Sequence, residues 1–169
     1  MIMRYLITRL LNEHIKKDFN SGNPLLDNYL KTQAKQDVNR DLSACFVLID
    51  DNNVVKGFYT LSASSVNKEM LPVELAKKLP PSYQTLPTIL LGRLACDNSI
   101  KGQGYGEALL MNALRRSVET SESVGSLALV VDPIDDQSKS FYKRYGFILL
   151  SGTGKMLLPM KTIKSSYIN

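Results

Sequence analysis

The chain lacks several features that membrane and metal-binding proteins require. It has no run of about 18 apolar residues, the length that a transmembrane helix needs. Residues 1–7 form too short an apolar stretch for a signal peptide. With two cysteines and one histidine, a metal site is not expected. Cys45 and Cys96 lie in apolar runs, so we expect free buried thiols in a reducing cytoplasm. His14 precedes the first predicted helix and is expected at the surface.

The composition is that of an ordinary globular domain, with 44% hydrophobic and 22% charged residues among 169. This length suits one domain, which we place at residues 1–160, followed by a frayed polar C-terminal tail at 161–169. The net charge of +5 permits an acidic partner such as CoA or RNA, although a solvated basic surface is the commoner explanation. No motif of the usual RNA-binding modules is present.

Apolar periodicity and turn residues predict an alternating series of strands and helices. The predicted strands cover residues 4–10, 44–49, 54–64, 88–96, 126–131, 147–150 and 155–158. The predicted helices cover residues 24–40, 71–79, 107–118 and 136–145, the first capped by Asn23 and the last by Asp135 or Asp136. Hairpins followed by a strand–loop–helix–strand–helix unit predict an α/β protein of the α+β type around a mixed sheet. Gly92, inside a strand, indicates a bulge or a close backbone approach.

A glycine-rich stretch, Lys101-Gly102-Gln103-Gly104-Tyr105-Gly106, joins an apolar strand to an amphipathic helix. Such a loop presents backbone N–H groups to a phosphate, and glycines allow a close approach; a plain turn is the alternative. A P-loop is excluded because Glu107-Ala108 follows where Lys-Ser/Thr is required. The dinucleotide pattern Gly-x-Gly-x-x-Gly fits poorly, since the third glycine comes one residue early and the loop follows the fourth predicted strand.

This loop resembles the pyrophosphate-binding motif Gln/Arg-x-x-Gly-x-Gly/Ala of the GNAT superfamily of CoA-dependent N-acyltransferases, with Lys101 as the phosphate donor in place of Gln or Arg. Other segments resemble the toxin branch of this superfamily, whose members acetylate the amino acid on charged tRNA and are paired with ribbon-helix-helix antitoxins. These segments are residues 19–23, 26–30, 57–62, 91–95 and 140–147.

The resemblance implies a GNAT-like fold: a mixed, mostly antiparallel sheet of about six to seven strands, helices on both faces and two splayed parallel central strands. It also implies acetyl-CoA as co-substrate, no metal and a homodimer. The acyl-CoA would lie between the strands at 88–96 and 126–131. The backbone of Leu94, Ala95 and Cys96 would hold the pantetheine and thioester, residues 101–106 the pyrophosphate, and Ser138 and Phe141 would contact the CoA.

Tyr142 is the predicted general acid, which protonates the thiolate expelled when a neutral amine attacks the thioester. A phenol with a pKa of about 10 is protonated at neutral pH and suits a leaving thiol with a pKa of about 8.5. The alternative is that Tyr142 only packs with Phe141 and Tyr145 on one helix face. The match to the family pattern Phe-Tyr-x-x-x-Gly-Phe favours the catalytic role.

Three further questions stay open in the sequence. No general base is evident, which favours the α-amino group of an aminoacyl ester over a lysine side chain with a pKa of about 10.4. Arg93, a charge within an apolar strand, either has a structural partner or contacts a substrate phosphate. Cys96 as a nucleophile is a second mechanism, but the direct transfer typical of the family favours an inert thiol.

Two functions compete with acetylation of charged tRNA. One is a GNAT enzyme that acetylates a small amine, a peptide or a protein N-terminus. The other is a catalytically inactive GNAT fold that serves as a binding module.

Overall fold

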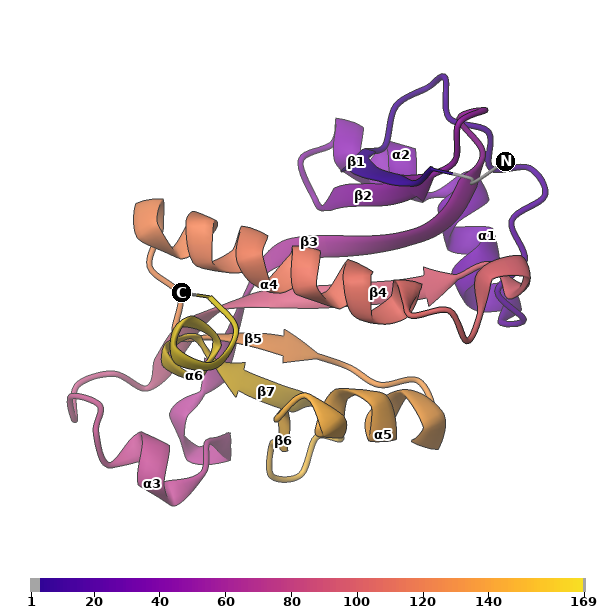
Figure 1. Ribbon diagram of the computed structural model, residues 1–169. Helices are drawn as coiled ribbons and strands as arrows, with labels where there is room; N and C mark the ends of the chain where they lie inside the picture. The colour runs from indigo at the N-terminus through magenta and orange to yellow at the C-terminus, as the bar shows by residue number, and fades with distance from the viewer. Residues whose placement is uncertain (1–3, 169) are drawn as a thin grey trace. The chain divides into compact units, whose positions relative to one another are not determined.

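The computed structural model describes residues 4–168. Its contacts divide the chain into two compact units. The first unit contains the residues up to Ser62 together with Gly92–Ala113, and the second contains Ala63–Leu91 and the residues from Leu114 onward. Figure 1 traces the chain through both of them. The single domain expected over residues 1–160 stays a prediction.

Three strands of the first unit pair in antiparallel fashion. Strand β1 (Leu6–Arg9) pairs with β2 (Ala44–Ile49), and β2 pairs with β3 (Val55–Asn67). The β2–β3 turn forms because the Asp50 side chain accepts hydrogen bonds from the backbone N–H groups of Asn52 and Val54, at 2.8 and 3.0 Å. The predicted hairpin is therefore confirmed.

Helices α1 (Pro24–Thr32) and α2 (Ala34–Asn39) cover one face of these strands. Asn23 caps α1 by accepting from the N–H groups of Leu25 and Leu26. The single helix predicted for residues 24–40 is interrupted at Gln33, whose backbone leaves helical geometry. Leu30 and Ala34, on either side of this break, are fully buried. The break therefore coincides with packing against the strands and not with a helix-breaking residue.

The start of α4 (Tyr105–Ser123) packs close to β3 within the first unit. A Cβ on Gly57 would lie 2.8 Å from Leu109 Cδ1 and 3.2 Å from the Ala95 carbonyl oxygen, so β3 requires glycine there. Two residues on, the Tyr59 hydroxyl donates to Asn112 Oδ1 at 2.6 Å. These contacts fix the first turns of α4 against the strand.

His14 is buried, so the prediction that it lies at the surface is wrong. Its side chain is 7% exposed, and its Nδ1 accepts a hydrogen bond from the Leu11 N–H at 3.0 Å. Burial lowers the pKa of His14, which keeps the imidazole neutral and able to accept. This local hydrogen bond gives His14 a structural role. The sequence pattern did not reveal it.

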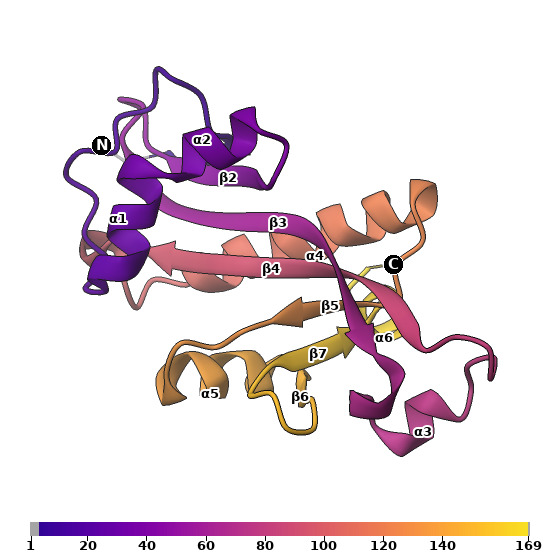
Figure 2. The same ribbon diagram turned by 180° about the vertical axis from the view of Figure 1, so that it is seen from behind.

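The second unit contains the parallel strand pair. The N-terminal part of β4 (Thr85–Cys96) runs parallel to β5 (Ala128–Val131), β5 is antiparallel to β7 (Met156–Pro159), and β7 is antiparallel to β6 (Ile148–Leu149). Figure 2 shows these strands from behind. The helical segments of this part are η1 (Lys68–Met70), α3 (Val73–Ala76), α5 (Asp136–Arg144) and α6 (Met160–Ser166).

The seven strands follow the order β1-β2-β3-β4-β5-β7-β6. The predicted mixed, mostly antiparallel sheet with one parallel pair is confirmed. Among the described helices, none is long and apolar enough to cross a membrane.

The prediction of a frayed C-terminal end is wrong as far as Ser166, because α6 follows β7 directly. Met160 and Ile163 are 4% and 0% exposed. The two residues are three positions apart and therefore lie on one face of the helix. In so short a helix, two buried apolar side chains are enough to hold it against the protein. The Tyr167 hydroxyl also donates to the carbonyl oxygen of Tyr145 at the end of α5.

Replacing Ile163 with alanine tests this correction. We expect Ile163→Ala to lower the free energy of unfolding by about 2–5 kcal/mol, because it leaves a cavity at a fully buried position. The exposed neighbour Lys164→Ala should change it by less than about 0.5 kcal/mol. Urea denaturation measures both, and equal effects of the two variants would support a frayed end instead.

Candidate active site

The C-terminal half of β4 lies in the first unit and carries four of the predicted site residues. Its pairing with β5 covers Thr88–Leu91, and the strand then continues to Cys96. Leu94 and Cys96 are half-buried, and Ala95 is buried in the core beneath α1 and α2. A Cβ on Gly92 would meet Thr60 Oγ1 at 3.0 Å, which confirms the close backbone approach expected at this glycine.

The glycine-rich loop after β4 has backbone N–H donors that are available to a ligand. Helix η2 (Asn98–Ile100) ends just before it, and α4 begins at Tyr105. Gly102 and Gly104 have φ values of +77° and +87°, a backbone conformation that favours glycine. Among the described residues, the backbone N–H groups of Gly102, Gln103 and Gly104 have no hydrogen-bond partner. Exposed donors at the start of a long helix fit a pyrophosphate, as the loop motif predicts.

Lys101 is exposed, but its ammonium group is not free of protein contacts. It donates a hydrogen bond to the backbone carbonyl oxygen of Ser21. An ammonium group has three N–H donors, so this bond occupies one of them. The predicted phosphate donor is thus also attached to the segment that precedes α1.

Arg93 lies over an aromatic ring. Its Cζ atom is 3.5 Å from the centroid of the Tyr29 ring on α1, a cation–π contact. The Tyr29 hydroxyl donates to Asp37 Oδ2 at 2.8 Å, and burial together with this bond raises the pKa of Tyr29 to about 12. No carboxylate forms a salt bridge with Arg93 within the described part of the chain. The ring therefore holds the guanidinium in place and leaves its N–H donors for another ligand.

The two thiols have the properties of inert cysteines. Burial raises the pKa of Cys96 to about 11, and burial raises that of Cys45 to about 12. Both are free thiols. A nucleophilic role for Cys96 would need a thiolate, and its surroundings favour the protonated form.

Helix α5, in the second unit, carries Ser138, Phe141 and Tyr142. Its N-terminus is a capping box, in which the Ser138 N–H donates to Asp135 Oδ1 at 2.7 Å and the Asp135 N–H donates to Ser138 Oγ at 3.2 Å. These bonds lower the pKa of Asp135. The helix end that presents Ser138 is therefore well ordered by its own sequence.

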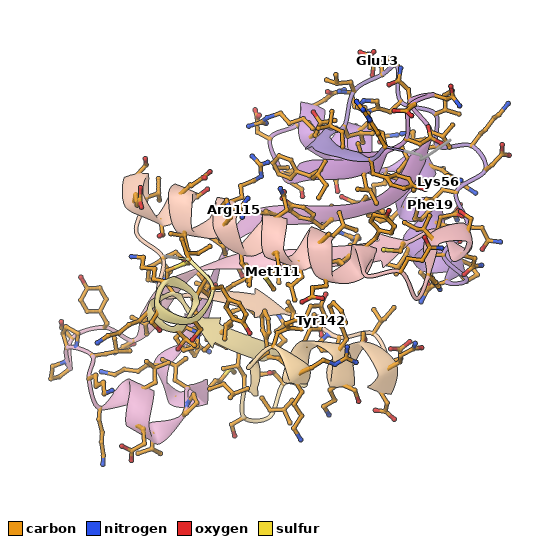
Figure 3. All side chains as sticks on the ribbon, in the orientation of Figure 1. Glu13, Phe19, Lys56, Met111, Arg115 and Tyr142 are labelled. Carbon is orange, nitrogen blue, oxygen red and sulfur yellow. The ribbon has the colours of Figure 1, made fainter. Side chains whose placement is uncertain are left out.

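The Tyr142 ring is packed among aromatic rings. Its centroid lies 5.2 Å from that of Phe141 and 5.3 Å from that of Phe147, both edge-on, and the residue is 6% exposed. Figure 3 labels Tyr142 on α5. Burial raises the pKa of Tyr142, so the phenol is protonated at neutral pH. Its hydroxyl has no hydrogen-bond partner among the described residues. Packing thus fixes the ring and leaves the proton for a ligand.

Residues 41–149 match the family of acetyltransferase (GNAT) domains. The chain belongs to this GNAT family. It is 37% identical over 129 residues to a tRNA-acetylating toxin of Mycobacterium tuberculosis (strain ATCC 25618 / H37Rv), covering 76% of this chain and 75% of the relative. The family and toxin branch predicted from the motifs are confirmed, and this GNAT protein is an N-acetyltransferase that uses acetyl-CoA.

Two solved structures share the whole fold of this GNAT chain. A tyrosine-to-phenylalanine variant of KacT has a TM-score of 0.90 at 31% identity, over 95% of this chain and 98% of that one. AtaT complexed with acetyl-methionyl-tRNAfMet has a TM-score of 0.90 at 28% identity, over 96% and 98%.

Thiol labelling tests the inert character of the cysteines. With a pKa of about 11, roughly 0.1% of Cys96 is thiolate at pH 8, so iodoacetamide should modify it slowly in the folded protein. Cys45 should react no faster. Mass spectrometry of the native and urea-unfolded protein measures both rates. Labelling of native Cys96 at the unfolded rate would contradict this account.

Proposed function

We propose that the protein transfers the acetyl group of acetyl-CoA to the α-amino group of the amino acid on a charged tRNA, and so blocks translation. The observation that carries this proposal is the likeness to the structure of AtaT complexed with acetyl-methionyl-tRNAfMet, over nearly the full length of both chains. The 37% identity to a tRNA-acetylating toxin supports the same acceptor class.

The donor half of the proposed site consists of β4 and the loop after it. The backbone of Leu94, Ala95 and Cys96 would bind the pantetheine arm and the thioester carbonyl. Residues 101–106 would bind the pyrophosphate, supported by the unpaired N–H groups of the loop and the start of α4. Ser138 and Phe141 would contact the CoA from α5.

In the proposed reaction, the nitrogen lone pair of the neutral amine attacks the thioester carbonyl carbon, and a C–N bond forms. Collapse of the tetrahedral intermediate breaks the C–S bond and leaves its electron pair on sulfur. Tyr142 gives its phenolic proton to that sulfur, and the proton lost by the nitrogen returns to the phenolate through solvent. Burial raises the pKa of Tyr142, so the phenol holds the proton that the expelled thiolate takes up.

Arg93 is the proposed contact for an acceptor phosphate. It is half-buried, has no carboxylate partner within the described residues and lies over the Tyr29 ring. A planar guanidinium with unused donors suits a phosphodiester, and the net charge of +5 favours a polyanionic acceptor.

The proposal also covers the partners of this protein and its location in the cell. A solved structure shows a tyrosine-to-phenylalanine variant of AtaT bound to the C-terminus of the antitoxin AtaR, and we infer a ribbon-helix-helix antitoxin for this chain as well. A homodimer and a cytoplasmic location, where charged tRNA is found, belong to the same proposal.

An acetyl-transfer assay tests the acceptor. The protein is incubated with radiolabelled acetyl-CoA and either charged tRNA, uncharged tRNA or a set of small amines and peptides. We expect label only on charged tRNA, and alkaline hydrolysis should release it as the N-acetyl amino acid. Label on small amines or peptides alone would favour the competing GNAT function, and no label at all would favour a binding module.

Removing the Tyr142 hydroxyl tests the general acid. Tyr142→Phe should lower kcat by about 10²–10⁴-fold, because the thiolate then leaves unprotonated. Tyr145→Phe, at the C-cap of the same helix and in the same ring cluster, is the matched control and should retain activity. Steady-state kinetics measures both, and equal rates for the two variants would exclude Tyr142 as the acid.

Salt dependence tests Arg93. Arg93→Met should raise the KM for charged tRNA about tenfold. It should also reduce the slope of log KM against log salt concentration by the amount expected for the loss of about one phosphate contact. The KM for acetyl-CoA should not change, and Arg93→Lys should restore part of the loss, as a charge without the planar fork. An unchanged salt slope in Arg93→Met would contradict a phosphate contact.

A further inference from the structure

The segment before α1 is joined to the end of β4 by hydrogen bonds between residues far apart in the sequence. The Asn20 N–H donates to Asp97 Oδ1 at 2.8 Å, and the Asn98 N–H donates to the Asn20 carbonyl oxygen at 2.8 Å. Lys101 adds a third bond, from its ammonium group to the Ser21 carbonyl oxygen. Figures 1 and 2 both show the start of α1 beside the end of β4.

The same segment is tied to α1. Ser21 is 5% exposed, and both its N–H and its hydroxyl donate to Asp27 Oδ1, at 2.9 and 2.6 Å. Gly22 then turns the chain with a φ of +88°, and Asn23 caps the helix. Whatever fixes Ser21 therefore also fixes the first turn of α1.

Lys101 is the donor that satisfies the Ser21 carbonyl among the described residues. A carbonyl oxygen in a buried residue needs a partner, and a charged donor makes a stronger bond than a neutral one. Lys101 is also the first residue of the loop proposed to hold the pyrophosphate. One side chain thus connects that loop to α1.

Helix α1 in turn orients Arg93. Tyr29 lies in α1, and its ring supports the guanidinium at 3.5 Å. A shift of the first turn of α1 would move this ring, because α1 is one continuous helix from Pro24 to Thr32. The hydrogen bonds at Ser21 therefore bear on the position of the residue proposed to contact the acceptor.

We propose that Lys101 is a positioning residue, which attaches the segment before α1 to the donor loop. Binding of acetyl-CoA to this loop then also orders α1 and the Arg93 side chain that packs against α1. The effect on the acceptor rests on the proposed function, whereas the connection between loop and helix does not. This role is separate from a contact of the same ammonium group with the pyrophosphate, which would act on CoA affinity.

Three lysine variants separate the two roles. Lys101→Met removes the donor, and Lys101→Arg keeps one. Lys56→Met is the matched control, because Lys56 Nζ lies 3.3 Å from Ser99 Oγ in the same neighbourhood but has no bond to residues 20–22. Figure 3 labels Lys56 and also Phe19, which directly precedes this segment. Lys56→Met thus removes one positive charge, as Lys101→Met does, but removes no hydrogen bond to residues 20–22.

Two measurements need no acceptor. Calorimetry gives the CoA affinity, and hydrogen–deuterium exchange of residues 18–30 is followed with and without acetyl-CoA. In the wild type, Lys56→Met and Lys101→Arg, acetyl-CoA should slow this exchange at least threefold. In Lys101→Met the slowing should be absent even at saturating acetyl-CoA, a concentration set from the dissociation constant measured for each variant.

A third measurement uses charged tRNA. At saturating acetyl-CoA, Lys101→Met should raise the KM for charged tRNA about tenfold relative to Lys56→Met, and Lys101→Arg should restore it. If the wild type acetylates no charged tRNA, the proposed function fails, and the exchange data still decide the role of Lys101.

One result would overturn the proposal: protection of residues 18–30 by saturating acetyl-CoA that persists in Lys101→Met. Should Lys101→Met fail to fold by circular dichroism, Asp97→Asn weakens the neighbouring bond to the Asn20 N–H and must reduce the protection for the proposal to stand.

Discussion

The unpaired backbone N–H groups between β4 and α4 are the constraint on which the proposed donor site depends. Gly102 and Gly104 hold the chain at positive φ, so that the loop turns and its N–H groups lack partners in the protein. Such donors are costly to leave unsatisfied when water is excluded, and an anionic ligand satisfies several at once. The rest of the first unit keeps this loop in place, through Gly57 beneath α4 and through the bonds from Asp97 and Lys101 to the segment before α1.

The charge distribution of the proposed site suits two anionic substrates and an expelled thiolate. The loop would offer backbone dipoles to the donor, whereas Arg93, a positive charge held on an aromatic ring, would contact the acceptor. Tyr142 has the opposite character, since burial among aromatic rings keeps it neutral. Cys96 is neutral for the same reason, which leaves direct transfer to the amine as the chemistry that these groups support.

Local signals in the sequence predicted much of this structure, and long-range contacts account for the rest. The Asp50 turn, the Asn23 cap and the Asp135–Ser138 box are all made by residues within four positions of each other. The break at Gln33, the burial of Ile163 and the ring beneath Arg93 depend on packing between distant segments, which periodicity cannot show. Family motifs identified the loop and Tyr142 as candidate site residues. They gave no sign that Lys101 bonds to Ser21, because a lysine in a motif looks the same whether it faces a phosphate or a carbonyl.

The most direct test of the central claim is the mass of the tRNA 3′ end after reaction. Charged tRNA is incubated with the protein and acetyl-CoA and digested with ribonuclease, and the aminoacyl-adenosine fragment is weighed by mass spectrometry. The account predicts a gain of one acetyl group on that fragment, dependent on acetyl-CoA and lost in Tyr142→Phe. An aminoacyl-adenosine of unchanged mass, from a protein that binds acetyl-CoA and acetylates other amines, would contradict it.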